Sequence, residues 1–261
     1  MVPYFENRLV KLYKGDCLSI MPQLKEQGIS IDLCLVDVPY GKVTACDWDV
    51  VIPMKPMWEG IGSLLKENRA CCMFSSQPFT SELILSNLRE FKYCWYWEKS
   101  NPGMAVHSKN RPMSAVEEIC VFSKAPMGHL SLLGDRRMVY YPQGIKKAGK
   151  KTVRAGFHST MLGARPNQVG KEYESFTGFH TNVLHFNGVP RRGNLHPTQK
   201  PVALLQYLIQ CYTNEGELVL DFAAGSGSTG EACMGTNRRC ILVEKDESFC
   251  EVIANRLSQL L

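Results

Sequence analysis

The chain has 261 residues, of which 44% are hydrophobic and 21% charged, and a formal net charge of +5 at pH 7. This length suits one large α/β domain with an insertion, or two small domains. No apolar run approaches the roughly twenty residues that a membrane span needs, and the first residues lack the charged-then-apolar layout of a signal peptide. We therefore expect a cytoplasmic protein with no membrane partner.

The cysteines and histidines favour neither a disulfide framework nor a metal site. The chain has 11 cysteines, an odd number, and several lie inside apolar runs, as is usual for reduced thiols. No two are spaced as Cys-X-X-Cys, and His180, His185 and His196 have no cysteine partners at zinc-finger spacing. We expect a reduced chain that binds no metal.

Short apolar runs alternate with helical patterns at both ends of the chain. We predict strands at residues 7–13, 33–36, 69–74, 91–99 and 117–124, and helices at 15–28, 54–68 and 78–90. After residue 196 we predict a helix, a strand at 218–222, a glycine-rich loop, a helix, a strand at 240–244 and a last helix. Strands that alternate with helices favour a parallel sheet covered on both faces.

The segment between Ala125 and Leu195 differs in composition. It holds eleven Lys and Arg against three Asp and Glu, interleaved with aromatic residues, and so carries all of the chain's positive excess. It has no sustained period, which is typical of an inserted module. One interpretation is a solvated loop; the other is a surface for polyanions, where cations neutralise phosphates and aromatic rings offer stacking faces. We divide the chain into 1–124, 125–195 and 196–261.

A glycine-rich loop in LDFAAGSGSTG follows the strand at 218–222 and precedes a helix. Gly225, Gly227 and Gly230 match the spacing G-x-G-x-x-G, which lets backbone approach a ligand beside a helix N-terminus. Glu244 ends the next strand, where a carboxylate accepts hydrogen bonds from ribose hydroxyls. The pair predicts a nucleoside-containing cofactor, and an NAD-dependent oxidoreductase, which shares both features, is one alternative.

The strand at 33–36 ends in DVPYG, residues 37–41. Asp, Pro and Gly often end a strand only because they make turns. In an open parallel sheet, however, ligands bind at the carboxyl ends of the strands, where the strand order reverses. We therefore expect Asp37 to Tyr40 to lie beside the glycine-rich loop.

Four motifs, in the order GDCLSIMPQL, DVPYG, HPTQKPVALLQYLI and LVLDFAAGSGSTGEAC, carry a family resemblance. The chain resembles the permuted (beta-class) DNA amino methyltransferases that use S-adenosylmethionine, and FSSQPFTSELILSNL and FKYCWYWEKS resemble the adenine-specific enzymes of phages and prophages. The resemblance covers residues 9–124 and 196–261. It implies an α/β fold: a seven-stranded, mostly parallel Rossmann-like sheet with one reversed strand near an edge, helices on both faces, and a target-recognition insertion at 125–195.

The family's catalytic tetrapeptide Asp-Pro-Pro-Tyr corresponds here to Asp37, Val38, Pro39 and Tyr40. By this resemblance the Asp37 carboxylate and the Val38 carbonyl accept the two hydrogens of an exocyclic amine, which exposes the nitrogen lone pair. Tyr40 would stack on a base flipped out of the duplex. Valine keeps the carbonyl of the proline it replaces but not its fixed φ, so a catalytically impaired DNA-binding descendant is a second alternative.

The resemblance also implies a binding site for S-adenosylmethionine. The residues expected to form it are Asp16, Cys17, Asp37, Thr198, Gln199, Lys200, Asp221, Phe222, Ala223, Gly225, Gly227 and Glu244. Asp16 and Cys17 would border the adenine, Glu244 the ribose, and residues 198–200 the methionine end, where Lys200 pairs with the carboxylate. Two of these residues have a simpler interpretation: Asp16 equally fits the cap of a helix, and Lys200 fits a solvated side chain.

The predicted activity is methyl transfer to N6 of adenine in double-stranded DNA, with Lys and Arg of 125–195 holding phosphates. Aspartate at the first motif position favours adenine over cytosine N4, where the family more often has serine, so a cytosine-N4 enzyme is a third alternative. A homodimer is left open, as are the recognition sequence and the biological role: evasion of a host nuclease, partnership with a restriction enzyme, or regulation. No role follows for Glu117 and Glu118.

Overall fold

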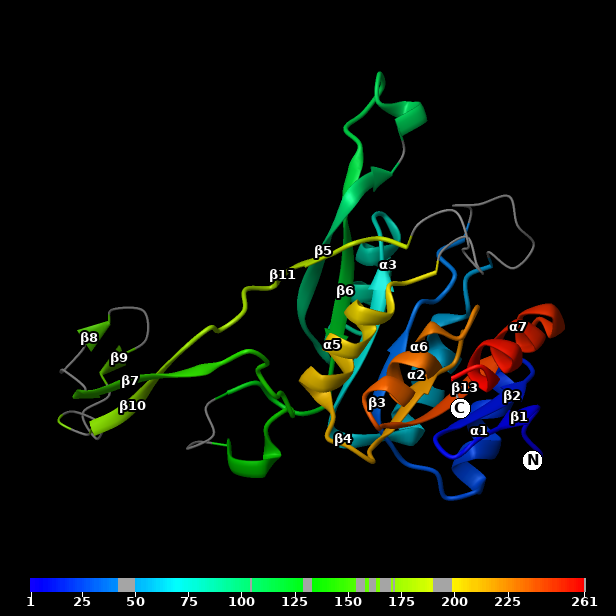
Figure 1. Cartoon of the computed structure of the whole chain (residues 1–261), viewed down its shortest axis with the longest axis horizontal. Helices are drawn as coiled ribbons and strands as arrows, with labels where there is room; N and C mark the ends of the chain where they lie inside the picture. Colours follow the sequence, from blue (N-terminus) through cyan, green and yellow to red (C-terminus); the bar gives the residue numbers. More distant parts are fainter. Residues whose placement is uncertain are drawn as a thin grey trace. The chain divides into compact units, whose positions relative to one another are not determined.

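The structure is a computed structural model that describes residues 1–41, 50–103, 105–128, 133–153, 158–159, 163–164, 170, 172–189 and 199–260 (Figure 1). The chain divides into two compact units, one of Met1–Tyr141 with Asn182–Leu261 and one of Pro142–Thr181. In the described part of the chain, no helix is long and apolar enough to cross a membrane.

One sheet of nine strands forms the centre of the larger unit, in the order β1-β2-β13-β12-β3-β4-β6-β5-β11. Its strands are β1 (Phe5–Glu6), β2 (Val10–Lys14), β3 (Ile31–Val36), β4 (Leu65–Ser75), β5 (Phe91–Gly103), β6 (Ser114–Phe122), β11 (Val183–Phe186), β12 (Leu218–Asp221) and β13 (Arg239–Glu244). Strands β2, β13, β12, β3 and β4 run parallel, and β11 runs parallel to β5. The sheet is therefore large, mixed and mostly parallel, as predicted.

The strand count of seven was too low, because two edge strands add to the predicted set. β1 has two residues and turns back on β2, with Phe5 opposite Leu12. β11 lies in the basic segment and pairs with β5, with Val183 opposite Tyr96. Neither is long enough for its period to be recognised. Two strands, β1 and β6, consequently run against their neighbours instead of one.

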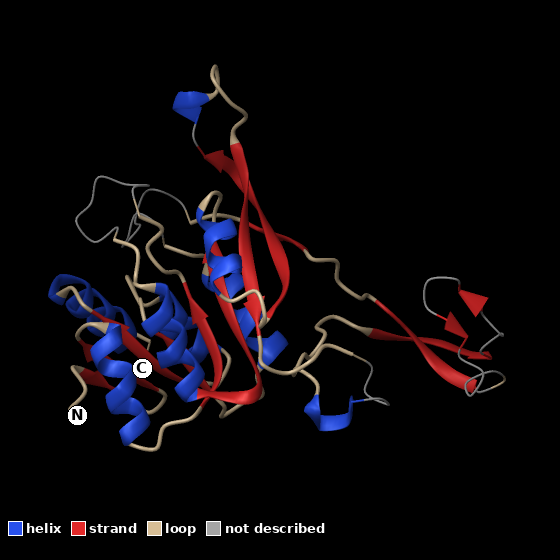
Figure 2. Ribbon diagram, turned by 180° about the vertical axis from the view of Figure 1, so that it is seen from behind, coloured by secondary structure: helices blue, strands red, loops and turns tan. Residues whose placement is uncertain are grey.

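Helices cover both faces of this sheet (Figure 2). One face carries α1 (Cys17–Glu26), α2 (Met54–Leu64) and α3 (Phe79–Ser86), and the other α5 (Val202–Tyr212), α6 (Ser228–Gly235) and α7 (Glu247–Ser258). Successive side chains of β3 enter the two cores in turn: Leu33 and Leu35 pack with α5–α7, and Cys34 and Val36 with α1–α3. Burial on both faces explains the continuous apolar runs of the central strands.

The helix predicted at 54–68 is shorter, because it ends at Leu64 and β4 begins at Leu65. The buried Asp32 of β3 causes the difference. Its Oδ1 lies 2.6 Å from the Nζ of Lys66 and 3.3 Å from the Nη2 of Arg69, so both cations reach it from an extended strand paired with β3. These long-range ion pairs outweigh the helical preference of the charged run.

The smaller unit, Pro142–Thr181, contains two antiparallel pairs in its described part. β7 (Lys146–Val153) pairs with β10 (Glu172–Thr177), and β8 (His158–Ser159) pairs with β9 (Gly163–Ala164). This unit is shorter than the basic segment at 125–195, whose flanking described residues belong to the larger unit. Short 3-10 turns occur at Ala105–His107 and Gly134–Arg136, in the larger unit.

Candidate active site

Three neighbouring parallel strands, β3, β12 and β13, end at one edge of the sheet. Asp37 follows β3, and the glycine-rich loop follows β12. The chain leaves β3 toward β4 on one side and leaves β12 toward β13 on the other, so the strand order reverses between them. Such a reversal is where open α/β sheets bind ligands. The two sequence motifs therefore lie side by side, close enough for the charge of Asp37 to act on Asp221.

In the glycine-rich loop, residues larger than glycine would not fit the backbone conformation or the space. Gly225 and Gly227 have φ values of 51° and 76°, in the left-handed region. A Cβ on Gly227 would lie 3.0 Å from the side chain of Ile253 on α7. Helix α6 begins at Ser228, so its first amides lie at the loop. The loop thus has the open backbone and helix N-terminus that contact with a nucleoside ligand requires.

The Glu244 carboxylate is held by backbone amides. Oε2 accepts a hydrogen bond from the N–H of Gly225 at 2.7 Å, and Oε1 accepts from Lys245 at 2.8 Å and Asp246 at 2.9 Å. Burial raises the pKa of Glu244, and these hydrogen bonds oppose that shift. Glu244 therefore joins the glycine-rich loop to the turn before α7.

Asp221, Phe222 and Ala223 form the start of the loop. The Asp221 carboxylate is buried, and it accepts hydrogen bonds from Thr229 Oγ1 at 2.6 Å and from the amide of Ala223 at 3.1 Å. Burial raises the pKa of Asp221 to about 7, because these hydrogen bonds offset only part of the cost of burying charge. Phe222 is also buried. Asp221 and Phe222 therefore support the loop from inside the protein.

Asp16 and Cys17 lie at the turn between β2 and α1, next to the end of β13. Asp16 caps α1, because its Oδ1 accepts from the amide of Leu18 at 2.9 Å. Its Oδ2 lies 3.6 Å from Lys245 Nζ. Burial raises the pKa of the Cys17 thiol to about 11, so the thiol stays protonated at neutral pH. The structure thus supports the helix-cap interpretation of Asp16 and places both residues at the same edge of the sheet.

Asp37 and Tyr40 contact one another directly. The hydroxyl of Tyr40 donates to Asp37 Oδ1 at 2.9 Å, and its ring stacks on Phe79 of α3, with centroids 5.1 Å apart and planes 22° apart. Burial, followed by the charge of Asp37, raises the pKa of Tyr40 well above its usual value, so the hydroxyl keeps its proton. Val38 is buried and Pro39 is partly exposed. Phe79 holds the Tyr40 ring from the protein side.

The segment before α5 brings a cation to the same carboxylate. Lys200 Nζ donates to Asp37 Oδ2 at 2.5 Å, and its side chain is only 8% exposed, so it is not a solvated lysine. Gln199 Oε1 accepts a hydrogen bond of 3.4 Å from Ser226 of the glycine-rich loop. Thr198 lies outside the described residues. Lys200 contacts Asp37 and its neighbour Gln199 contacts the glycine-rich loop, so this segment connects the two.

Sequence reasoning missed Glu117 and Phe79. Glu117 lies on β6, where its Oε2 is 3.5 Å from Lys200 Nζ and its Oε1 forms an ion pair with Lys99. These two cations lower the pKa of Glu117 despite its burial. In the sequence, Glu117 is an acidic residue at the start of an apolar strand. This position indicates that the carboxylate has a polar or charged partner, but not which residue the partner is.

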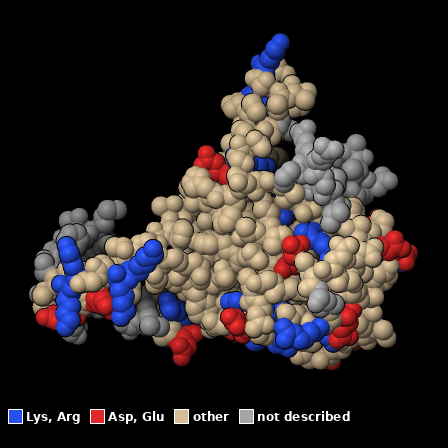
Figure 3. All heavy atoms as spheres, in the orientation of Figure 1, with Lys and Arg blue, Asp and Glu red and all other residues tan. Residues whose placement is uncertain are grey.

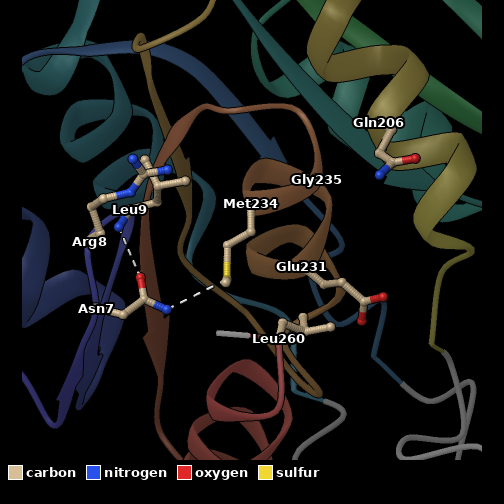
Figure 4. Close-up of a pocket in the computed structure, with 8 residues that line it drawn as sticks. All are labelled: Asn7, Arg8, Leu9, Gln206, Glu231, Met234, Gly235 and Leu260. Atoms are coloured by element: carbon tan, nitrogen blue, oxygen red, sulfur yellow. Dashed lines mark hydrogen bonds between the residues drawn. The ribbon is translucent and has the colours of Figure 1, made fainter.

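A hollow of about 480 Å³ lies at the other end of the strands (Figure 4). Its lining residues are Asn7, Arg8, Leu9, Gln206, Glu231, Met234, Gly235 and Leu260. Asn7 accepts hydrogen bonds there from the amides of Leu9 and Val10, at the start of β2. The hollow is therefore separate from Asp37. Among the described residues, no group of three or more His, Cys, Asp and Glu side chains is placed to hold a metal ion.

Comparison with known proteins gives consistent matches. A family described as DNA methylase matches residues 31–256. The DNA adenine methyltransferase YhdJ of Escherichia coli K12 is 40% identical, over 97% of this chain and 84% of its own length. The type II methyltransferase M2.MboI of Moraxella bovis is 38% identical, over 99% and 92%. The crystal structure of the M1.HpyAVI–SAM complex shares the fold, with a TM-score of 0.63 and 20% identity over 95% of this chain and 99% of that one.

Proposed function

We propose that this chain, which belongs to the DNA methylase family, transfers a methyl group from S-adenosylmethionine to N6 of adenine in double-stranded DNA. One observation carries the proposal: the Asp37 carboxylate and the glycine-rich loop lie at the same edge of the sheet, where the strand order reverses. The near-full-length similarity to an adenine methyltransferase, YhdJ, supports it. The family match decides against the NAD-dependent oxidoreductase.

The residues around the loop fit S-adenosylmethionine, which supplies an electrophilic methyl group on a sulfonium when bound. The left-handed glycines at 225 and 227 leave the backbone open, and Glu244 is fixed where a ribose would meet it. The residues that would hold the cofactor are Asp16, Cys17, Asp37, Thr198, Gln199, Lys200, Asp221, Phe222, Ala223, Gly225, Gly227 and Glu244. Of these, Asp221, Phe222 and Lys200 are among the buried residues. Asp221 and Phe222 therefore act through the shape of the loop, and Lys200 acts through its ion pair with Asp37.

The catalytic residues act on the amine of the target base. The lone pair of the amine is delocalised into the purine ring, so the nitrogen is a poor nucleophile. Two acceptors, the Asp37 carboxylate and the Val38 carbonyl, favour a pyramidal nitrogen whose lone pair is available. Asp37 is also the group that takes the proton lost by that nitrogen. Tyr40, backed by Phe79, provides the stacking surface for the flipped base.

The pair β7–β10 would contribute to DNA binding through one of its two faces. Figure 3 shows Lys and Arg side chains, with Asp and Glu side chains among them, over this pair. On one face each lysine has a glutamate: Lys147 lies 3.0 Å from Glu174, and Lys151 lies 3.6 Å from Glu172. Lys146 is opposite Thr177 in the register and faces away from these ion pairs, and strand alternation turns Lys150 away from Lys151 onto the same face. Within the described part of the chain, no carboxylate forms an ion pair with Lys146 or Lys150. This second face is the one suited to phosphates.

Paired substitutions test that face. Changing Lys146 and Lys150 together to alanine should lower the slope of log affinity against log salt by about two, since each phosphate contact contributes about 0.9. Changing Lys147 and Lys151 together is the matched control and should lower it by less than one. Equal decreases of the slope in the two double variants would contradict the assignment of the Lys146 and Lys150 face to phosphate binding. Fluorescence anisotropy with labelled duplex DNA measures both slopes.

The activity itself is tested by incubating the protein with tritiated-methyl S-adenosylmethionine and unmethylated duplex DNA of mixed sequence. The digested nucleosides are then separated by chromatography. Label in N6-methyladenine establishes the proposed reaction. Label in N4-methylcytosine keeps the fold and the mechanism but changes the base. Cofactor binding without any transfer supports the impaired descendant, in which Val38 marks a disabled site.

A further inference from the structure

Each oxygen of the Asp37 carboxylate already accepts one hydrogen bond. Oδ1 accepts from the Tyr40 hydroxyl at 2.9 Å, and Oδ2 accepts from Lys200 Nζ at 2.5 Å. The second contact is charge-assisted, because it joins an ammonium to a carboxylate. In its proposed role, Asp37 must accept a hydrogen from the base amine. The Lys200 ammonium competes with that amine for the carboxylate, so a weaker contact at Oδ2 makes Asp37 a better acceptor for the substrate.

The Lys200 ammonium has a second acceptor beside it. Glu117 Oε2 already forms an ion pair with Lys200 Nζ at 3.5 Å, but this distance is long for a hydrogen bond, and the buried oxygen accepts no hydrogen bond from the described residues. A buried acceptor with so long a contact is poorly satisfied, so a movement of Lys200 toward Glu117 is favourable. A shift of well under 1 Å brings the two atoms into hydrogen-bond distance.

Water is a less favourable destination for the ammonium. The Lys200 side chain is only 8% exposed, and its Nζ lies 5.0 Å from the centre of the Phe74 ring, so it is largely shielded from water. A buried cation that loses one carboxylate is costly unless another replaces it. The Tyr40 hydroxyl is the other group that blocks Asp37, but its ring is held by the stack with Phe79.

We propose that Glu117 is a positioning residue that receives the Lys200 ammonium when the target base enters, and thereby releases Asp37 Oδ2 for the base amine. The proposal rests on the proposed catalytic role of Asp37. No covalent bond changes in this step, and the ammonium stays paired throughout. In the absence of DNA, Lys200 keeps the catalytic carboxylate covered.

Opposite effects of two substitutions separate this exchange from a merely structural ion-pair network. Glu117→Gln leaves a weaker acceptor, so Lys200 remains on Asp37, and the single-turnover rate of methyl transfer should fall at least tenfold. Lys99→Met removes the competing cation on Glu117, so the rate should stay level or rise. A network that only stabilises the fold predicts a fall in both. Glu98→Gln, which removes a carboxylate from β5 that contacts His185, is the matched control.

The assay uses the whole protein, mixed-sequence duplex DNA and saturating S-adenosylmethionine, with melting temperatures as a check on folding. Glu117→Asp keeps the charge and should recover most of the rate, which a loss of packing would not allow. A normal rate in Glu117→Gln, or equal falls in Glu117→Gln and Lys99→Met, overturns the exchange. Asp37→Asn is measured in parallel to test the catalytic role of Asp37 separately. If Asp37→Asn transfers methyl groups at an undiminished rate, Asp37 has no catalytic role. If its rate falls while Glu117→Gln keeps a normal rate, only the proposed exchange of Lys200 is overturned.

Discussion

Asp37 and Glu244 are carboxylates at the same edge of one sheet, yet they are held in different ways. Glu244 accepts its hydrogen bonds from the backbone amides of residues 225, 245 and 246. Asp37 accepts its hydrogen bonds from two side chains, Tyr40 and Lys200. Backbone donors are fixed by the fold, whereas side-chain donors can rotate away. In the proposed function, the part of the site that would bind the cofactor is therefore built before any ligand arrives, and the part that would act on the base is covered.

The largest expected effect is that of Asp37→Asn, which keeps the shape of the side chain. An amide is a weaker acceptor and cannot take a proton, so the rate of methyl transfer should fall by about 10³-fold or more. The affinity for S-adenosylmethionine should fall far less, by about tenfold at most, because Asp37 is only one of the residues proposed to hold the cofactor. Single-turnover transfer and isothermal titration calorimetry measure the two quantities.

The contrast between Asp37 and Glu244 is wrong if Asp37→Asn abolishes cofactor binding as completely as it abolishes methyl transfer. In that case Asp37 would organise the cofactor site, and the separation into a prebuilt half and a covered half would be wrong. Asp32→Asn is a poor control because Asp32 pairs with Lys66 and Arg69 inside the sheet. Glu67→Gln, on an exposed carboxylate that contacts Lys124, is a better one.

The second largest effect, on cofactor affinity, is expected from Glu244→Gln. The glutamine amide group can accept from one side only, so its NH₂ would face either Gly225 N–H or the amides of residues 245 and 246. The affinity for S-adenosylmethionine should fall by about 10- to 100-fold, while saturating cofactor restores a near-normal rate. Glu247→Gln, on an exposed carboxylate paired with Lys14, serves as the control. A lower rate at saturation with unchanged affinity would reverse the roles assigned to Asp37 and Glu244.

The central part of the fold was predictable because its strands are buried on both faces. Such strands, β3, β12 and β13 among them, leave apolar runs in the sequence. The start of β4 was not predictable, since it depends on the contact of Lys66 with Asp32 from another strand. β11 was not predicted because four residues at the edge of a sheet show no clear alternation of apolar and polar side chains. The family itself is confirmed by the match over residues 31–256.

The site was predictable where one motif supplies both the residue and its position. Asp37 and Glu244 each follow or end a strand, so the topology alone brings them to one edge. Glu117 and Phe79 were missed because their roles depend on partners far away in the sequence, Lys200 and Tyr40. No local pattern specifies such a pair, and only the folded chain brings them together.

The last expected effect is on stability and concerns Asp221, whose pKa burial raises to about 7. In the unfolded chain an aspartate has a pKa near 3.9, so between about pH 4 and pH 7 the folded protein binds a proton that the unfolded chain releases. The free energy of unfolding must therefore fall as pH rises through this window, by roughly 4 kcal/mol at most, and level off above it. Asp221→Asn cannot titrate and should lack this part of the dependence, so its stability relative to the unsubstituted protein should improve from pH 5 to pH 8. Urea unfolding at several pH values measures the difference. Parallel curves would mean that the hydrogen bonds from Thr229 and Ala223 hold Asp221 ionised, and its carboxylate would then resemble that of Glu244 in being fixed as an acceptor.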